Sequence, residues 1–235
     1  MKILGIDSSG LVASVALVQD DIKVAEYTVN YKKTHSQTLM LMLDEIVKMT
    51  ELDLEDIDAI AVAAGPGSFT GLRIGAATVK GLGMALDKPV ISVPTCHGLA
   101  YNLWGADGVV CPIMDARRNQ VYTGIYEFSG EEMNCLMEQD AMDIKELIEI
   151  LNKMGKSVTF TGDGVPVYKG ALSGGLTVAY KLAPAHMNRQ SAGAVATLGM
   201  KYFREGICEQ ASEHKPIYLR KSQAEREREE KIGKE

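Results

Sequence analysis

The stretch ILGIDSSGLVASVALV, residues 3–18, sets the fold of the first half of the chain. An apolar run ends at Asp7, two serines and a glycine follow, and a second run rich in valine and alanine comes next. Two apolar runs on either side of a short polar turn predict a β-hairpin. The stretch VVCPIMDARRNQVYTGIYEF, residues 109–128, repeats this plan with Asp115 in the place of Asp7. The repeat predicts two similar lobes, each opening with a hairpin that has an aspartate at its mouth.

Strand and helix signals alternate after each hairpin. Gly65-Pro66-Gly67 ends one buried apolar run and precedes a helix, and Thr34 with Gln37 fits a capping box at the start of another helix. This alternation predicts an α/β fold with mixed sheets covered by helices. The predicted helices are 34–50, 70–86, 144–151 and 191–205, and the further strands are 59–64, 89–93 and 158–161. We expect an N-terminal lobe over residues 1–105, a C-terminal lobe over 106–222, and a charged, solvated tail without function over 223–235.

Composition limits the class of protein. The chain has 235 residues, 46% of them hydrophobic, and a formal net charge of −6, so it is globular and lacks the basic surface that binds a nucleic-acid backbone unaided. The four cysteines form no CxxC pair, which predicts reduced thiols and neither a zinc site nor a disulfide framework. The N-terminal apolar run is too short for a signal peptide or a membrane span, and we expect a cytoplasmic protein.

The aspartates at the two hairpin mouths, Asp7 and Asp115, are candidates for holding hydrated magnesium beside phosphates. An Asx turn with the following serines is the alternative for Asp7, and the sequence leaves both interpretations open. Ser8 and Ser9 are small enough for backbone amides to approach a phosphate. The second hairpin instead has Arg117 and Arg118, which can pair with a phosphate or fill its space. Efficient hydrolysis by this chain alone is therefore not expected.

The segment GPGSFTGLR, residues 65–73, joins a strand to a helix. Free amides and the helix dipole at such a junction favour an anion, although the Gly-Lys-Ser/Thr ending of a P-loop is missing. The alternative is that Ser68 or Thr70 is simply the N-cap. The residues of this segment that we predict to bind a nucleotide phosphate are Gly65, Gly67, Ser68 and Thr70.

Two helices of the first half are predicted to dock on a partner or on each other. The helix over 70–86 carries several glycines, each costing about 1 kcal/mol relative to alanine, which close approach of another helix would offset. The helix over 34–50 is apolar nearly all round, which indicates two buried faces, and an internally buried helix is the alternative. The predicted partner-binding residues are His35, Leu39, Met42, Ile46, Gly71, Arg73, Gly75, Thr78 and Leu82.

The four histidines show no spacing that places two on one helical face, so no metal held by histidine is predicted. GxSxG, the signature of a nucleophile elbow, is absent from the sequence. A protease is therefore the least favoured function.

Five segments together resemble the TsaB family, also called YeaZ, over nearly the whole chain. They are 6–9, 34–37, 65–73, 115–118 with Tyr122 nearby, and 216–220. The resemblance implies a two-lobed, duplicated actin-like fold of the ASKHA, ribonuclease H-like class. It also implies a non-catalytic scaffold for the complex that forms N6-threonylcarbamoyladenosine beside the tRNA anticodon.

The same resemblance implies the partners and the cofactor. The partners are the catalytic subunit TsaD, the ATPase TsaE and a threonylcarbamoyl-AMP synthase, with tRNA reached only through the complex. Whether the chain alone is a homodimer or a monomer stays open. Pairing through N-lobe helices is implied, as is ATP or ADP with magnesium at a subunit interface. TsaD holds its metal with two histidines one helical turn apart; here Thr95 and Leu99 stand in their places, and His97 is out of register. The rival hypothesis is an autonomous actin-like ATPase or kinase-like enzyme.

Overall fold

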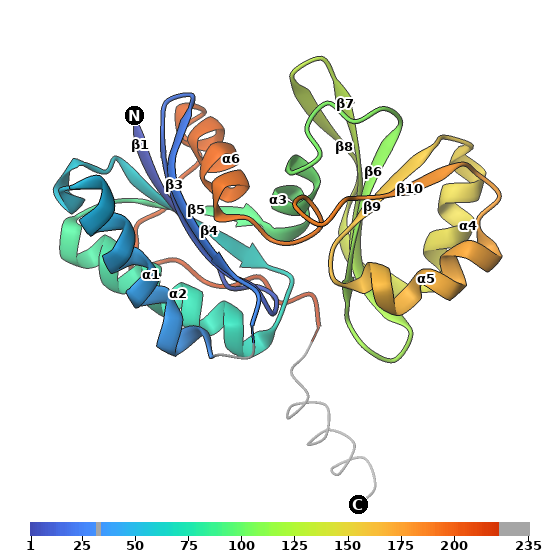
Figure 1. Ribbon diagram of the computed structural model, residues 1–235, viewed down its shortest axis with the longest axis horizontal. Helices are drawn as coiled ribbons and strands as arrows, with labels where there is room; N and C mark the ends of the chain where they lie inside the picture. Colours follow the sequence, from blue (N-terminus) through green and yellow to red (C-terminus); the bar gives the residue numbers. More distant parts are fainter. Residues whose placement is uncertain (32–33, 221–235) are drawn as a thin grey trace, which may run out of the picture.

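The computed structural model describes residues 1–31 and 34–220 and contains two five-stranded sheets (Figure 1). The predicted tail over 223–235 lies outside the described residues. The first sheet has the order β3-β2-β1-β4-β5, and the second has the order β10-β9-β6-β7-β8. The second order, reversed, is the first order with each strand replaced by its counterpart, so the predicted duplication is confirmed. The strands are β1 (Lys2–Asp7), β2 (Ala13–Gln19), β3 (Ile22–Val29), β4 (Ala59–Gly65), β5 (Val90–Pro94), β6 (Val109–Asp115), β7 (Gln120–Ser129), β8 (Glu132–Asp143), β9 (Val158–Thr161) and β10 (Tyr180–Leu182).

Each sheet is mixed in the same way. The opening hairpins pair β1 with β2 and β6 with β7 antiparallel, while β4 and β9 lie parallel to β1 and β6. Asp7 is paired with Ser14, and Asp115 with Val121, so each aspartate ends its strand beside the turn. The two predicted hairpin mouths are therefore equivalent positions in the two lobes.

The outer faces of the sheets are covered by four helices, three of which the sequence predicts. The helices α1 (His35–Thr50) and α2 (Phe69–Leu86) cover one face of the first sheet, and α4 (Ile144–Met154) and α5 (Gly164–Gly175) cover the outer face of the second (Figure 1). A short 3₁₀ helix, η1 (Leu54–Asp56), precedes β4. Among the described residues, no helix combines the length and the apolar character needed to cross a bilayer. The α1 helix begins as predicted, but the Thr34 side chain makes no capping hydrogen bond, so the capping box is wrong.

Two helices cover the lobe opposite to the one that chain order suggests. The helix α6 (Ala192–Arg204) packs on the first sheet, and the apolar side of α3 (Thr95–Tyr101) packs with β6 and β7 of the second. The α3 helix also contacts β4, β5 and α6, so it lies between the two lobes. Small residues make the α6 contact close: a side chain at Gly5 would meet the Ala192 carbonyl, and one at Gly199 would meet Ala61. The assignment of all of 106–222 to the second lobe is therefore wrong for α6.

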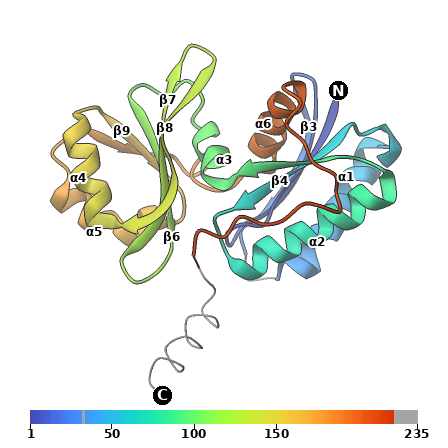
Figure 2. The ribbon, with the colours of Figure 1, turned by 180° about the vertical axis from the view of Figure 1, so that it is seen from behind.

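The segment after α6 returns along the first lobe (Figure 2). Val90 and Glu209 exchange backbone hydrogen bonds of 2.9 Å, and the Ile217 amide donates to the Ala64 carbonyl at 2.7 Å. The segment ends near the second hairpin, where Arg220 Nη1 donates to the Ala116 carbonyl at 2.8 Å. Residues 216–220, one of the resemblance motifs, thus connect the end of β4 to the second lobe.

Candidate functional site

A cleft of about 630 Å³ lies between the two lobes at the hairpin mouths. It is lined by the first hairpin, the glycine-rich turn, the second hairpin and the returning segment 217–220. The predicted phosphate-binding residues that line it are Ser9, Gly67, Ser68, Thr70, Asp115 and Arg117. Arg118 lines an adjacent hollow with Tyr168, while Asp7, Ser8 and Gly65 line neither cavity. The structure therefore brings most, but not all, of the predicted set to one place.

Asp7 lies beneath the cleft surface and is only 2% exposed. Its Oδ1 accepts hydrogen bonds from the Ser9 amide at 2.9 Å and the Ser9 hydroxyl at 2.7 Å. Burial raises the pKa of Asp7 to about 6, because the loss of hydration outweighs the two Ser9 hydrogen bonds and the attraction of His35. The Asx-turn interpretation is the one that the geometry supports, and the Ser9 amide already has its acceptor.

The glycine-rich turn packs against the first hairpin. The Ser68 amide donates to the Ser9 carbonyl at 2.6 Å, and the Ser68 hydroxyl caps α2 by accepting from the Gly71 amide at 3.3 Å. The Ser8 hydroxyl donates to the Gly71 carbonyl at 2.9 Å. A side chain at Gly67 would meet the Ser9 carbonyl, and one at Gly71 would meet the Ser8 carbonyl. The prediction that a second helix backbone accounts for these glycines is wrong: the hairpin turn does.

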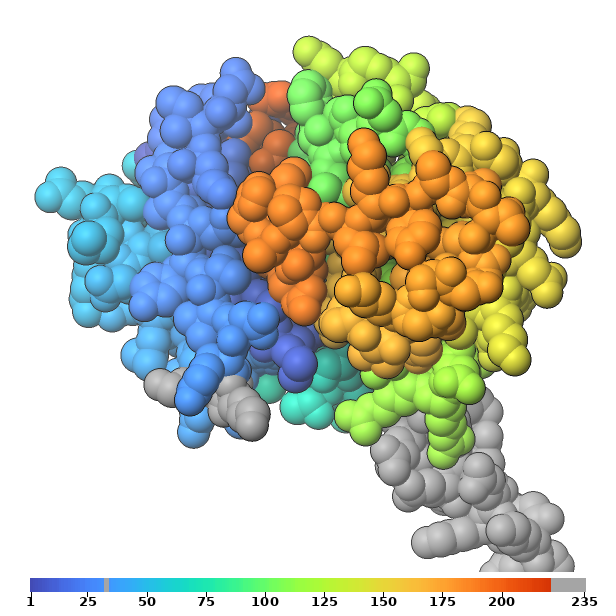
Figure 3. All heavy atoms as spheres, turned by 45° about the vertical axis from the view of Figure 1, so that its right-hand side comes forward, coloured from blue at the N-terminus to red at the C-terminus, as the bar shows by residue number. Residues whose placement is uncertain are grey.

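His35 extends the same contact to α1. Its Nε2 lies 2.8 Å from the Gly10 carbonyl, to which it donates in the tautomer that carries a proton there. On the other side of the turn, Gly10 packs against the buried Gln190 side chain from the segment between β10 and α6. That segment, orange in Figure 3, meets the blue surface of the first lobe. His35 thus contacts the hairpin of its own chain, although we predicted that it would contact a partner.

The second hairpin differs from the first in charge and backbone. Arg117, Arg118 and Asn119 all have left-handed backbone conformations, with φ of 62°, 55° and 59°, which are uncommon for non-glycine residues. Asp115 accepts from the Arg117 amide at 2.8 Å and from the Tyr168 hydroxyl at 2.9 Å. Burial, followed by the adjacent Asp115, raises the pKa of Tyr168 to about 12, so its hydroxyl remains a donor. The turn displays two exposed arginine side chains, and its aspartate is bonded within the protein.

The predicted partner-binding residues separate into buried and exposed groups. Leu39, Met42 and Ile46 are at most 4% exposed and pack on the first sheet, so they are core residues and the prediction is wrong for them. Gly71 and Gly75 are buried against Ser8, Leu82 is half-buried, and Thr78 donates to the Ile74 carbonyl. Arg73 is exposed, and its guanidinium carbon lies 4.0 Å from the centre of the Phe69 ring.

Sequence reasoning missed the apolar residues that α1 and α2 expose. These are Met40 (51% exposed), Leu41 (68%), Met49 (76%) and Met84 (65%), which we call the α1–α2 face. The signal was present in the sequence, because α1 is apolar on more sides than a sheet can cover. Which residues face outward became clear only from the packing.

The comparisons with known proteins agree with this architecture. The family model described as "TsaD: tRNA N6-adenosine threonylcarbamoyltransferase" matches residues 24–228. The tRNA threonylcarbamoyladenosine biosynthesis protein TsaB of Bacillus subtilis (strain 168) is 32% identical over 227 residues, which cover 96% of each chain. The chain belongs to the TsaB family. The solved structure of YeaZ from Pseudomonas aeruginosa has a TM-score of 0.80 at 25% identity and covers 93% of this chain and 99% of that one.

More distant structures confirm the fold class. The inorganic polyphosphate/ATP-glucomannokinase from Arthrobacter sp. strain KM has a TM-score of 0.51 at 10% identity, covering 87% of this chain and 99% of that one. Such a likeness shows the duplicated two-lobed fold of the actin-like and sugar kinase class, as predicted, and nothing about activity. In this TsaB-family chain Thr95 and Leu99 are both buried in α3.

Proposed function

We propose that this chain is the non-catalytic subunit in the biosynthesis of N6-threonylcarbamoyladenosine beside the tRNA anticodon. In this role it binds and stabilises a TsaD-type catalytic subunit. The match to TsaB over almost the full length carries the proposal. The match to the TsaD family model supports it, because two chains of one fold can pair through equivalent surfaces. TsaE, the threonylcarbamoyl-AMP synthase and tRNA are then reached through the assembled complex.

The α1–α2 face is the surface we assign to that catalytic subunit. Large apolar side chains on two neighbouring helices favour a protein interface, because water leaves their surface on docking. Three of the four residues are methionines, whose flexible side chains adapt to a partner. The two helices sit on the sheet face away from the second lobe (Figure 2), and residues at the start of both, such as His35 and Thr70, line the interlobe cleft, so a partner docked there reaches the edge of the cleft.

Leu41→Glu should weaken association with the catalytic subunit at least tenfold. The substitution removes a large apolar contact and places a charge in a desolvated interface, where single residues account for 2 kcal/mol or more. The measurement is the mass and affinity of the mixture, by light scattering and calorimetry, together with transfer activity. Because Leu41 is exposed in the free chain, the variant should retain the wild-type melting curve.

The matched control is Val167→Glu, which places the same charge on an exposed apolar residue of α5 in the second lobe. It should associate like the wild-type chain. If the wild-type chain stays monomeric with the catalytic subunit and leaves transfer unchanged, the proposed function fails. If both variants associate normally, the function stands and the α1–α2 face is the wrong surface.

The residues of the cleft do not fit a nucleotide held by this chain alone. Asp7 is buried and bonded to Ser9, and the amides of Ser9, Ser68 and Gly71 already have protein acceptors. These three amides are therefore not free to donate to an anion at the turn, which weakens binding by this chain alone. For the cofactor, the proposal is therefore only that ATP or ADP with magnesium binds at the interface with the catalytic subunit. Arg117 supplies a positive charge there.

The isolated chain should show no saturable binding of ADP with magnesium at concentrations that saturate the complex. Arg117→Ala should weaken ADP binding by the complex about tenfold, since a charge-assisted hydrogen bond contributes about 1.5 kcal/mol or more. Lys153→Ala, on the exposed side of α4, is the control that should change nothing. Fluorescence anisotropy with a labelled ADP provides the measurement. Tight binding and turnover by the isolated chain would instead support the autonomous ATPase or kinase-like alternative.

A further inference from the structure

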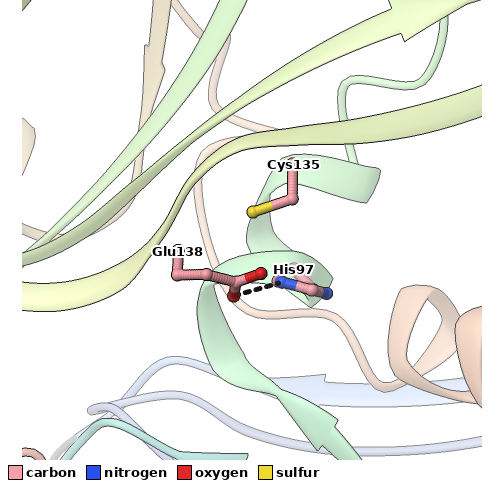
Figure 4. A group of neighbouring side chains, drawn as sticks. All are labelled: His97, Cys135 and Glu138. Carbon is pink, nitrogen blue, oxygen red and sulfur yellow. Dashed lines mark ion pairs between the residues drawn. The ribbon is translucent and has the colours of Figure 1, made fainter.

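Three potential metal ligands from distant parts of the sequence meet away from the cleft, where α3 lies against the second sheet. His97 comes from α3, and Cys135 and Glu138 come from β8 (Figure 4). Their ligand atoms all lie within 4.8 Å of one another, and His97 Nε2 is 4.0 Å from the nearer Glu138 oxygen. Nothing in the cysteine or histidine spacing signals this group, because the fold alone brings α3 and β8 together.

Irregular pairing of β8 places Cys135 and Glu138 on the same side. Residues three apart in a regular strand point to opposite faces. Here the pairing of β7 with β8 shifts register twice, as Thr123 pairs with Asp140, Ile125 with Met137 and Tyr126 with Cys135. Extra residues of this kind form β-bulges, which redirect side chains. The two bulges therefore bring both ligands towards His97.

His97 is already oriented as a metal ligand. Its Nδ1 lies 2.9 Å from the Tyr202 hydroxyl, and its Nε2 is buried without a hydrogen-bond partner. Metal-binding histidines typically fix the ring through a hydrogen bond at the other nitrogen, which leaves a lone pair for the metal. The ring also packs edge-on against Tyr126, with centroids 5.0 Å apart.

The backbone around the three residues is held by a bridging side chain. Gln139, next to Glu138, accepts from the Cys96 amide at 3.2 Å and donates to the Gly65 carbonyl at 2.9 Å. These bonds hold β8, next to Glu138, against α3 and against the end of β4. Cys135 and Glu138 are exposed at their positions, so rotation of their side chains is free to close the ligand separations to the ~3.5 Å of a tetrahedral site.

We propose that His97, Cys135 and Glu138 bind a zinc ion, with water as the fourth ligand. The donor set of one nitrogen, one sulfur and one carboxylate oxygen suits zinc, whereas magnesium and calcium take oxygen ligands. A thiolate beside a carboxylate gives two negative charges that a divalent cation balances. On binding, the thiol proton passes to solvent as the zinc–sulfur bond forms. Through Tyr202 on α6, the bound ion links the second sheet to a helix of the first lobe.

The test uses the untagged full chain and zinc chloride. Wild type should retain one zinc per chain after dialysis, by elemental analysis, and cobalt in its place should give a thiolate-to-metal absorption band. Cys135→Ser should lose the band and bind zinc at least tenfold more weakly. Zinc should also raise the melting temperature of wild type and leave that of Cys135→Ser unchanged.

Cys208→Ser is the matched control, since Cys208 is the other exposed cysteine of the described residues. It should behave like wild type in every measurement. Glu138→Gln supplies a second variant at an exposed position, and weaker zinc binding is expected there too. If wild type holds no zinc, or if Cys135→Ser and Cys208→Ser bind it equally, the proposed site is wrong.

Discussion

Gly71→Ala should destabilise the protein by about 3 kcal/mol, although alanine is the better helix former. The added methyl carbon would overlap the Ser8 carbonyl oxygen, a backbone atom that cannot rotate away. Overpacking a tight contact typically costs 1–3 kcal/mol, and here the neighbour is held by the hairpin. Ser8 also donates to the Gly71 carbonyl, so the whole turn would have to shift. Urea denaturation at neutral pH measures the loss.

Gly81→Ala is the matched control in the same helix. A methyl group at Gly81 meets nothing within 4 Å, so the variant should gain about 1 kcal/mol from helix propensity. Opposite signs for one substitution at two positions of α2 would show that the hairpin, and not helix propensity, selects glycine at 71. Two gains of similar size would contradict the docking of the glycine-rich turn on Ser8 and Ser9.

The sequence predicts the fold well where the apolar signal is continuous. The run at 59–64 becomes β4, buried along its whole length, and 158–161 is β9 at the predicted bounds. The strands β3 and β8 were missed because both lie at the edges of their sheets and neither contains a buried residue. Edge strands carry charges that blunt their open side, and this removes the apolar run by which a buried strand is recognised.

Two short helices were missed because they contain residues with low helix propensity. The helix α3 includes Thr95 and Gly98, and Pro166 lies in the first turn of α5. These residues are poor helix formers in isolation, so packing on the sheet supplies the stability. The packing of α6 on the first sheet and of α3 on the second could not be predicted either, because chain order does not say which sheet a helix will cover.

In the candidate site, too, the contiguous motifs could be predicted from the sequence and the roles of single side chains could not. Motifs contiguous in sequence, such as 65–73 and 115–118, were found, and the structure brings them to one cleft. The roles of single side chains were harder to predict: Met42 and Leu41 are adjacent and both apolar, yet one is buried and the other exposed. The His97, Cys135 and Glu138 group needed the register of β8, which no spacing rule contains.

Asp7→Asn should stabilise the protein by about 3 kcal/mol at pH 8 and leave its stability unchanged near pH 4. The pKa of Asp7 is raised from 3.8 to about 6 in the folded state by burial. Between these values the folded protein keeps a proton that the unfolded chain has released, so stability falls as pH rises through this window. A difference of about two units corresponds to about 3 kcal/mol, which the neutral asparagine avoids.

The measurement is the difference in unfolding free energy between variant and wild type, by urea denaturation at pH 4, 6 and 8. Asparagine keeps an oxygen that can accept from the Ser9 amide and hydroxyl, so the turn itself should survive. Asp107→Asn, on the exposed loop before β6, is the control and should show no pH-dependent gain. A gain for Asp7→Asn that is larger at pH 4 than at pH 8 would reverse the assigned sign. A more stable variant that supports less threonylcarbamoyl transfer would show that the buried carboxylate is retained for the complex at a cost to the free chain.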